Sequence, residues 1–161
     1  MRWIRTLSGR RTSKTKRVPG SLRKTGKGQT VELKVCALGI LFRNGKILLG
    51  KRTKYRTSYP NVWDMIGGHC ESGETLTQTL IRELQEEIGV TPIQFEHIST
   101  LLDSNNDHTY HVFVVTNWKG EPESLQPEEH SMIGWFGINE ALELELALPV
   151  YRELFTSLED N

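Results

Sequence analysis

Three glutamates at helical spacing are the residues of this sequence best suited to carry chemistry. Glu83, Glu86 and Glu87 stand at positions i, i+3 and i+4, so a helix would bring their carboxylates onto one face. Like charges at this spacing repel, and each pair costs about a few tenths of a kcal/mol. A hard cation such as Mg²⁺ or Mn²⁺ would reverse that cost and could bridge to the phosphate oxygens of a substrate. The spacing alone is equally typical of a solvated acidic face.

The residues before this face favour the metal interpretation. Gly67 and Gly68 open a loop in which backbone groups can approach a metal or a phosphate closely. Arg82 directly precedes Glu83 and can pair with a nearby carboxylate, which would hold that carboxylate in one orientation. The loop continues with further glycine and acidic residues, namely Glu71, Gly73 and Glu74.

The stretch from Gly68 to Val90 resembles the Nudix box at every defined position of that motif. The match runs through Gly68, five residues, Glu74, seven residues, and then the unbroken segment Arg82, Glu83, Leu84, Gln85, Glu86, Glu87, Ile88, Gly89 and Val90. One departure is Ile66, which stands where the family often has proline before the paired glycines. This difference affects the loop entry and the carbonyl contact expected there, but it touches no carboxylate.

The resemblance implies a metal-dependent hydrolase that cuts a phosphoanhydride bond in a nucleoside diphosphate derivative, with Mg²⁺ or Mn²⁺ as cofactor. It implies that Glu83, Glu86 and Glu87 are metal ligands, with a carbonyl of Gly67 or Gly68 as a further one. A carboxylate, either Glu83 or one outside the box, would orient or deprotonate the attacking water. The implied catalytic set is Glu83, Arg82, Glu86 and Glu74, the last acting indirectly.

Five residues outside the box are weaker candidates. Glu128 and Glu129 follow Pro127 in a loop, where similar family members often supply an extra catalytic or metal-binding glutamate; two solvated loop acids are the competing interpretation. Tyr59, Trp63 and Phe113 could stack on a nucleobase, although an aromatic ring on a strand is core packing by default. The five histidines include no close helical pair, and we assign none of them as a ligand.

A well-delimited helix should present the three glutamates. Between Thr75 and Ile88 apolar residues recur at helical period and form one stripe for packing on a sheet. Thr75 and Gln78 have the spacing of a capping box, and Gly89 suits the left-handed position that ends a helix. The stripe consists of Leu76, Leu80, Ile81, Leu84 and Ile88.

The remaining elements favour an α/β domain with a mixed sheet, an α/β/α sandwich as in the Nudix-like fold. The apolar segments 35–42 and 47–49 flank Asn44-Gly45, the strongest short signal for a hairpin. Strands first, then a helix, strands again and terminal helices argue against a regular βαβ wind. Further strands are predicted at 93–102, 110–118 and 132–136, and helices at 139–146 and 149–158.

Charge divides the chain into two regions. Ten of the twenty Lys and Arg residues fall between Arg2 and Lys27, where there is no acid. We therefore predict a basic, flexible tail over residues 1–30 and a hydrolase domain over 31–161. The tail could be a plain solvated extension, an organelle presequence or a nucleic-acid-binding arm. From Val31 onward ten bases face twenty acids, leaving about −10, so a polyphosphate would need cations to bind there.

Composition excludes several classes. No run approaches the roughly 18 apolar residues of a membrane span, and no secretory segment is visible, so we expect a cytoplasmic protein without a membrane partner. Cys36 and Cys70 lack disulfide or zinc spacing and are expected to be unpaired thiols. Oligomeric state cannot be read from the sequence.

The substrate is expected to be a small nucleotide. The leading hypothesis is a nucleoside triphosphate, such as 8-oxo-dGTP. The alternatives are ADP-ribose, a nucleotide sugar or a dinucleotide, and RNA 5′ ends, for which the tail would supply counterion release. A nucleotide-sensing module without activity is the non-enzyme alternative, but such a module would be expected to lose carboxylates that this chain keeps.

Overall fold

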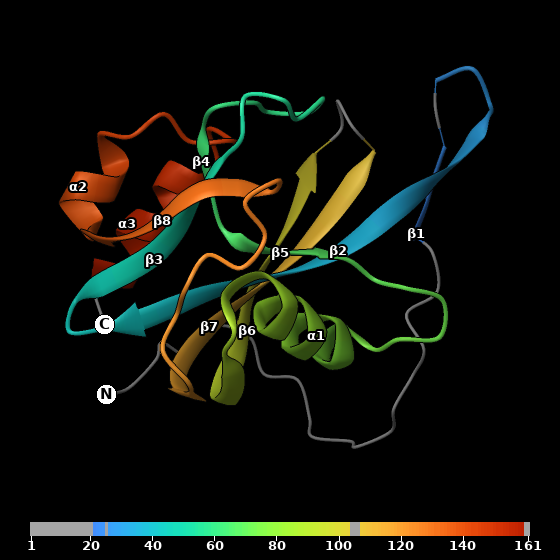
Figure 1. Ribbon diagram of the computed structural model, residues 1–161. Helices are drawn as coiled ribbons and strands as arrows, with labels where there is room; N and C mark the ends of the chain where they lie inside the picture. The colour runs from blue at the N-terminus through green and yellow to red at the C-terminus, as the bar shows by residue number, and fades with distance from the viewer. Residues whose placement is uncertain (1–20, 25, 104–106, 160–161) are drawn as a thin grey trace.

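Strands form the centre of the computed structural model, which describes residues 21–24, 26–103 and 107–159 (Figure 1). The elements in chain order are β1 (Ser21–Lys24), β2 (Thr30–Arg43), β3 (Lys46–Arg52), β4 (Trp63–Asp64), β5 (Ile66–His69), α1 (Leu76–Ile88), β6 (Thr91–Asp103), β7 (His108–Lys119), β8 (His130–Gly137), α2 (Ile138–Leu142) and α3 (Tyr151–Glu159).

The sheet is mixed, as the sequence predicted. Its central path runs β4-β3-β2-β7-β6, while β1 and β5 also pair with β2 and β8 pairs with β3. Strands β2 and β7 are parallel, and the other named pairs are antiparallel. Strand β2 therefore contacts four other strands and organises the whole sheet.

The hairpin between β2 and β3 is confirmed. Phe42 lies opposite Ile47 and Arg43 opposite Lys46, which leaves a two-residue turn between the strands. Asn44 and Gly45 have φ values of 53° and 71°, the left-handed conformation that both central residues of a type I′ turn require.

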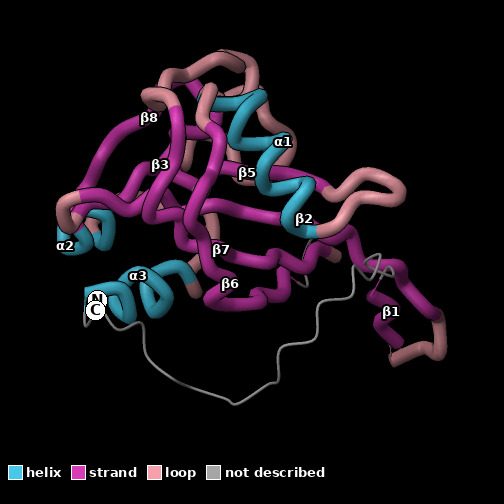
Figure 2. Tube along the Cα trace, turned by 90° about the horizontal axis from the view of Figure 1, so that it is seen from below, coloured by secondary structure: helices cyan, strands magenta, loops and turns pink. Residues whose placement is uncertain are grey.

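Helices cover both faces of the sheet, because apolar residues of the central strands point alternately to the two sides. Helix α1 lies on one side of the strands and α3 on the other (Figure 2). The strand residues that face α2 and α3 are Leu38, Ile40, Val112 and Val114. Those that face α1 are Ala37, Leu41, Phe113 and Val115.

The glutamate-bearing helix begins and ends where the sequence predicted. Thr75 is the N-cap and forms a complete capping box with Gln78, and Gly89 ends the helix at a φ of 72°. Opposite the helix, a Cβ on Gly39 would lie 3.1 Å from Leu80 and Leu84. The glycine in β2 therefore lets α1 pack closely on the strand.

Two predicted elements differ from the structure. The helix expected at 139–146 ends at Leu142, because the chain beyond it runs alongside Trp63. The Trp63 N–H donates to the Glu145 carbonyl, and the Ala147 N–H donates to the Trp63 carbonyl. Residues 21–24, placed in the predicted tail, form β1 and pair with the start of β2.

The remaining predictions concern the N-terminal tail, the two cysteines and membrane-spanning helices. Residues 1–20 lie outside the described residues, so the proposed boundary at residue 30 stays a prediction. Cys36 and Cys70 are free thiols. Within the described part of the chain, no helix is long and apolar enough to cross a membrane.

Candidate active site

A cavity of about 550 Å³ brings together residues from β2, β3, β5, α1 and β7. Its size falls in the range typical of small-molecule sites. Glu83 and Glu87 line this cavity from α1, and Gly67 and Gly68 line it from β5. Residues from the start of the predicted motif and from its helix thus face the same cavity.

Glu87 is the most unusual residue of the cavity. It is 5% exposed, and its Oε2 atom has no hydrogen-bond partner among the described residues. Burial, together with the neighbouring Glu83, raises the pKa of the Glu87 carboxyl to about 9. The carboxyl group therefore holds a proton at neutral pH in the arrangement described.

His130 lies against Glu87 without forming an ion pair. The His130 Nδ1 atom is 3.7 Å from Glu87 Oε2, a distance that would suit one. Burial, however, lowers the pKa of His130 to about 4. Between pH 4 and 9 both groups are consequently neutral, and the histidine adds no charge that would stabilise a buried carboxylate.

The paired glycines lie against the half-buried Glu83 and the buried Glu87. The Gly67 backbone N–H donates to the Glu87 carboxyl group. A Cβ on Gly68 would lie 2.6 Å from Glu83 Oε1, so any side chain there would displace the carboxylate. Burial raises the pKa of Glu83 as well, and Glu83 is hydrogen-bonded to Glu87.

Arg82 links the carboxylates of the motif. Its guanidinium donates to both oxygens of Glu74, from Nε at 2.7 Å and Nη2 at 3.0 Å. Its Nη1 atom donates to Glu83 Oε1 at 2.7 Å and to Glu86 Oε2 at 3.3 Å. The hydrogen bonds from Arg82 hold the pKa of Glu74 at about 2. Arg82 thus restricts Glu83 to one orientation, as its position in the sequence indicated.

The three helix glutamates differ in how far they are buried and in whether they line the cavity. Glu86 keeps 49% of its side chain exposed and does not line the cavity. Among the described residues, only Cys36, His69 and His108 form a group of three whose potential ligand atoms all lie within 4.8 Å of one another. The predicted acidic face exists, but its carboxylates differ in burial and partners.

The carboxylates nonetheless fit a hard divalent cation. The set offers oxygen donors, one buried oxygen lacks a partner, and Gly68 leaves space that a side chain would fill. Glu83 and Glu87 would hold such an ion, with Glu86 on the exposed side. A bound cation would neutralise phosphate charge and make water a stronger nucleophile. Arg82 holds the Glu83 carboxylate in position by a hydrogen bond to Oε1.

The two loop glutamates, Glu128 and Glu129, lie in different environments. Glu129 lines the cavity and pairs with Arg56, whose Nη1 atom lies 2.7 Å from Glu129 Oε1. Glu128 is exposed, and its backbone carbonyl accepts a hydrogen bond from Thr53. The structure therefore places only Glu129 within the site.

The three aromatic candidates also lie in different environments. Tyr59 lines the cavity, and its hydroxyl donates to Asp103 at 2.6 Å. Trp63 packs edge-on against Phe136, with ring centroids 4.8 Å apart. Phe113 is 6% exposed and packs in the core beneath α1. Tyr59 is thus the one of the three that the structure places beside the glutamates.

Sequence reasoning missed a buried polar network in the cavity wall. Asp64 accepts hydrogen bonds from Arg52 at 3.1 Å and from the Tyr151 hydroxyl at 2.9 Å. Arg52 also donates to the backbone carbonyls of Ser58 and Tyr59, which fixes the loop that carries Tyr59. The available signal was an acidic residue inside the apolar run 62–66.

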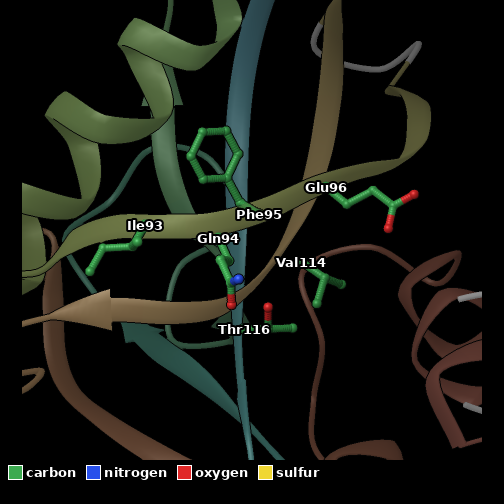
Figure 3. Close-up of a pocket in the computed structure, with 6 residues that line it drawn as sticks. All are labelled: Ile93, Gln94, Phe95, Glu96, Val114 and Thr116. Atoms are coloured by element: carbon green, nitrogen blue, oxygen red, sulfur yellow. The ribbon is translucent and has the colours of Figure 1, made fainter. Parts of the chain in front are cut away.

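A second hollow, of about 450 Å³, lies over β6 and β7 (Figure 3). Its only charged residue is Glu96, and its walls are otherwise the side chains Ile93, Gln94, Phe95, Val114 and Thr116. Phosphate chemistry needs several charged groups, so the cavity beside α1 is the better candidate.

Comparisons with known proteins show the family to which this chain is similar. A NUDIX domain profile matches residues 32–158. The CTP pyrophosphohydrolase of Escherichia coli is 32% identical over 110 residues, covering 67% of this chain and 78% of that protein. The 8-oxo-dGTP diphosphatase of the same organism is 30% identical over 105 residues, covering 64% and 81%. The solution structure of the E. coli ORF135 protein is similar with a TM-score of 0.66 and 27% identity, covering 80% of this chain and 89% of that chain. The matched region contains the whole of α1 and the paired glycines, and this chain belongs to the NUDIX family of hydrolases.

Proposed function

We propose that this chain is a nucleoside triphosphate pyrophosphohydrolase that acts with Mg²⁺ or Mn²⁺ and releases a nucleoside monophosphate and pyrophosphate. The observation that carries the proposal is the pairing of the half-buried Glu83 with the buried Glu87 in the wall of a ligand-sized cavity. A carboxyl group with an unpartnered buried oxygen is costly for a protein to keep, and a cation would offset that cost.

The chain's own residues divide the work. Glu83 accepts a proton from the attacking water, and Arg82 holds the carboxylate in place. Glu74 in turn fixes Arg82 through two hydrogen bonds. Lys34 and Arg56 line the same cavity and would bind the phosphate oxygens of the substrate. These parts stabilise charge that develops during in-line attack on phosphorus.

The triphosphate class is supported by the names of two relatives, and the site offers an aromatic ring to a nucleobase. Two similar proteins carry names that describe hydrolysis of CTP and of 8-oxo-dGTP. Tyr59 lies in the cavity with the glutamates and could stack on a purine or pyrimidine base. We therefore place a triphosphate, such as 8-oxo-dGTP, ahead of ADP-ribose, nucleotide sugars, dinucleotides and RNA 5′ ends.

A product-resolved assay tests the proposal. Normal and oxidised nucleoside triphosphates, ADP-ribose, a dinucleoside polyphosphate and triphosphorylated RNA would each be incubated with the protein and Mg²⁺ or Mn²⁺. We expect the best triphosphate to exceed every other class at least tenfold in kcat/KM, with monophosphate and pyrophosphate as products. A preference for ADP-ribose or RNA would overturn the substrate class. No hydrolysis of any substrate with either metal would overturn the enzyme itself.

A further inference from the structure

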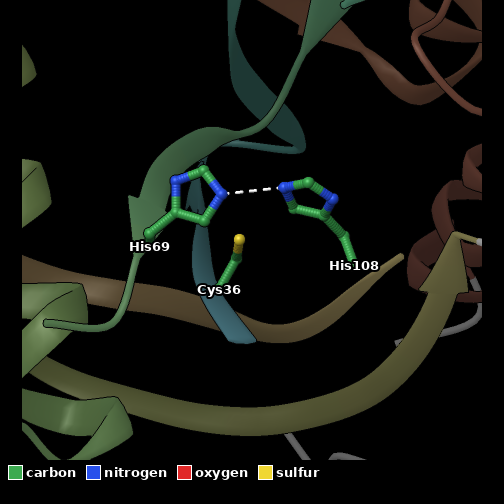
Figure 4. A group of neighbouring side chains, drawn as sticks. All are labelled: Cys36, His69 and His108. Carbon is green, nitrogen blue, oxygen red and sulfur yellow. Dashed lines mark hydrogen bonds between the residues drawn. The ribbon is translucent and has the colours of Figure 1, made fainter. Parts of the chain in front are cut away.

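A second group of side chains in the same cavity has the chemistry of a different kind of metal site. Cys36, His69 and His108 each offer a potential ligand atom, and these atoms all lie within 4.8 Å of one another. The two imidazole rings face each other through their Nε2 atoms, 2.7 Å apart, with the Cys36 sulfur beside them (Figure 4). We propose that these three residues form a Zn²⁺ site, separate from the carboxylate site on α1.

Strand register explains why the three residues meet. Cys36 of β2 lies directly opposite His69 of β5. On the other side of β2, His108 of β7 lies opposite Lys34. Lys34 is two residues from Cys36, so the side chains of His108 and Cys36 point to the same face of the sheet. Tyr110 stacks on His108 with nearly parallel rings and supports its orientation. The cluster is therefore built on three paired strands, which are more rigid than loops.

The donor set selects the metal. Thiolate and imidazole suit Zn²⁺, whereas Mg²⁺ prefers carboxylate and phosphate oxygens. Three protein ligands leave a fourth tetrahedral position, which water or a substrate oxygen can take. In tetrahedral zinc sites two imidazole nitrogens lie about 3.3 Å apart, so the rings of His69 and His108 would need to separate by about half an ångström.

Binding exchanges protons for the metal. A cysteine must lose its thiol proton, and a histidine must be neutral, before either can bind a metal. On binding, the Sγ–H bond of Cys36 breaks, an Sγ–Zn bond forms and the proton passes to solvent. The imidazole hydrogen between the two rings moves to an Nδ1 atom, so that both Nε2 lone pairs reach the metal.

Cobalt substitution tests this site apart from enzyme activity. The full-length protein, reduced and freed of metal, would be titrated with Co²⁺ in excess Mg²⁺. Charge transfer from a thiolate to cobalt gives a near-ultraviolet band that carboxylate ligation does not. We expect this band to saturate at one equivalent and to disappear when Zn²⁺ displaces the cobalt. Zn²⁺ affinity is then measured by competition with a chromophoric chelator.

Variants assign the ligands. Cys36→Ser should abolish the band, and His108→Gln should weaken Zn²⁺ binding at least tenfold, a loss that even supporting residues of metal sites can cause. Cys70→Ser, which removes the other free thiol, and Glu87→Gln should keep both the band and the affinity. Circular dichroism checks each fold, and His108→Gln decides if Cys36→Ser fails to fold. A band that is missing in the wild type, survives Cys36→Ser or depends on Cys70 or Glu87 would overturn the site.

Discussion

Helices α1 and α3 cover opposite faces of one sheet, yet they bury different chemistry. The buried positions of α3 are apolar apart from the Tyr151 hydroxyl, which donates to Asp64. Helix α1 buries Leu80, Leu84 and Ile88 and, on the same side, the carboxyl group of Glu87. A buried carboxyl group must be neutralised or paired, which costs stability. The face of α3 thus serves the fold, and the face of α1 gives up stability for a reactive group.

The largest expected effect is the loss of stability from a substitution in the core beneath α3. Phe155 is 0% exposed in the core beneath α3. Phe155→Ala should lower the free energy of unfolding by about 3–5 kcal/mol, because it removes buried contacts and leaves a cavity. Chemical denaturation gives this value, and the exposed neighbour Glu153→Ala should change it by less than about 0.5 kcal/mol. A loss below about 1 kcal/mol for Phe155→Ala would contradict the assigned role of α3.

A substitution of the buried glutamate on α1 should instead lower the rate of hydrolysis. Glu87→Gln should lower kcat by about 10²-fold or more, the scale of one preorganised electrostatic contact to a transition state. The melting temperature of the metal-free protein should stay the same or rise, because a neutral amide replaces a buried carboxyl group. Steady-state kinetics and thermal melts measure both, with Thr77→Ala on the exposed side of α1 as control. A variant that loses stability and rate together would mean that Glu87 serves the fold.

A pH series sharpens the comparison further. The folded pKa of Glu87 is about 9, far above its ordinary 4.5. Between pH 4.5 and 9 the folded protein therefore holds a proton on Glu87 that the unfolded chain has lost. The stability contributed by this proton should therefore fall as pH rises toward 9. His130, with a folded pKa of about 4 against 6.5, acts in the opposite sense only below pH 6.5. In chelator, between pH 6.5 and 9, the melting temperature should fall more steeply for the wild type than for Glu87→Gln. Parallel curves would show that Glu87 does not carry this proton.

The smallest effect is expected at the N-terminus. Deleting residues 1–30 removes β1 but no described residue that lines the cavity. We expect kcat/KM on the best small nucleotide to fall by less than tenfold, or about 1.4 kcal/mol. A larger loss would show that this segment belongs to the catalytic domain. A salt-dependent loss confined to RNA would instead favour a nucleic-acid-binding arm.

Features set by neighbouring residues could be predicted from the sequence, and features set by strand register could not. Thr75, Gln78 and Gly89 delimit α1 through contacts within a few residues, and Asn44-Gly45 makes its turn in the same local way. Helical spacing placed the three glutamates on one face but could not show that Glu87 is buried while Glu86 is half exposed. That difference depends on what packs against the helix.

The same limit hid the rest of the cavity. Strand β5 carries only four residues, two of them glycines, and gives no recognisable strand pattern. Without its pairing to β2, nothing in the sequence brings His69 opposite Cys36. Asp64 likewise joins Arg52 and Tyr151 from three distant segments. Contacts of this kind follow only from the assembled sheet.

Metal titration of thermal stability tests most directly the claim that α1 buries a carboxyl group for a cation. A ligand that binds only the folded state raises the melting temperature as its concentration rises above Kd. We expect Mg²⁺ and Mn²⁺ to stabilise the wild type, with a clearly smaller effect in Glu86→Gln and Glu87→Gln and an unchanged effect in Thr77→Ala. An equal metal response in the wild type and both glutamate variants would contradict the claim, and the acidic face of α1 would then be a solvated surface without a metal.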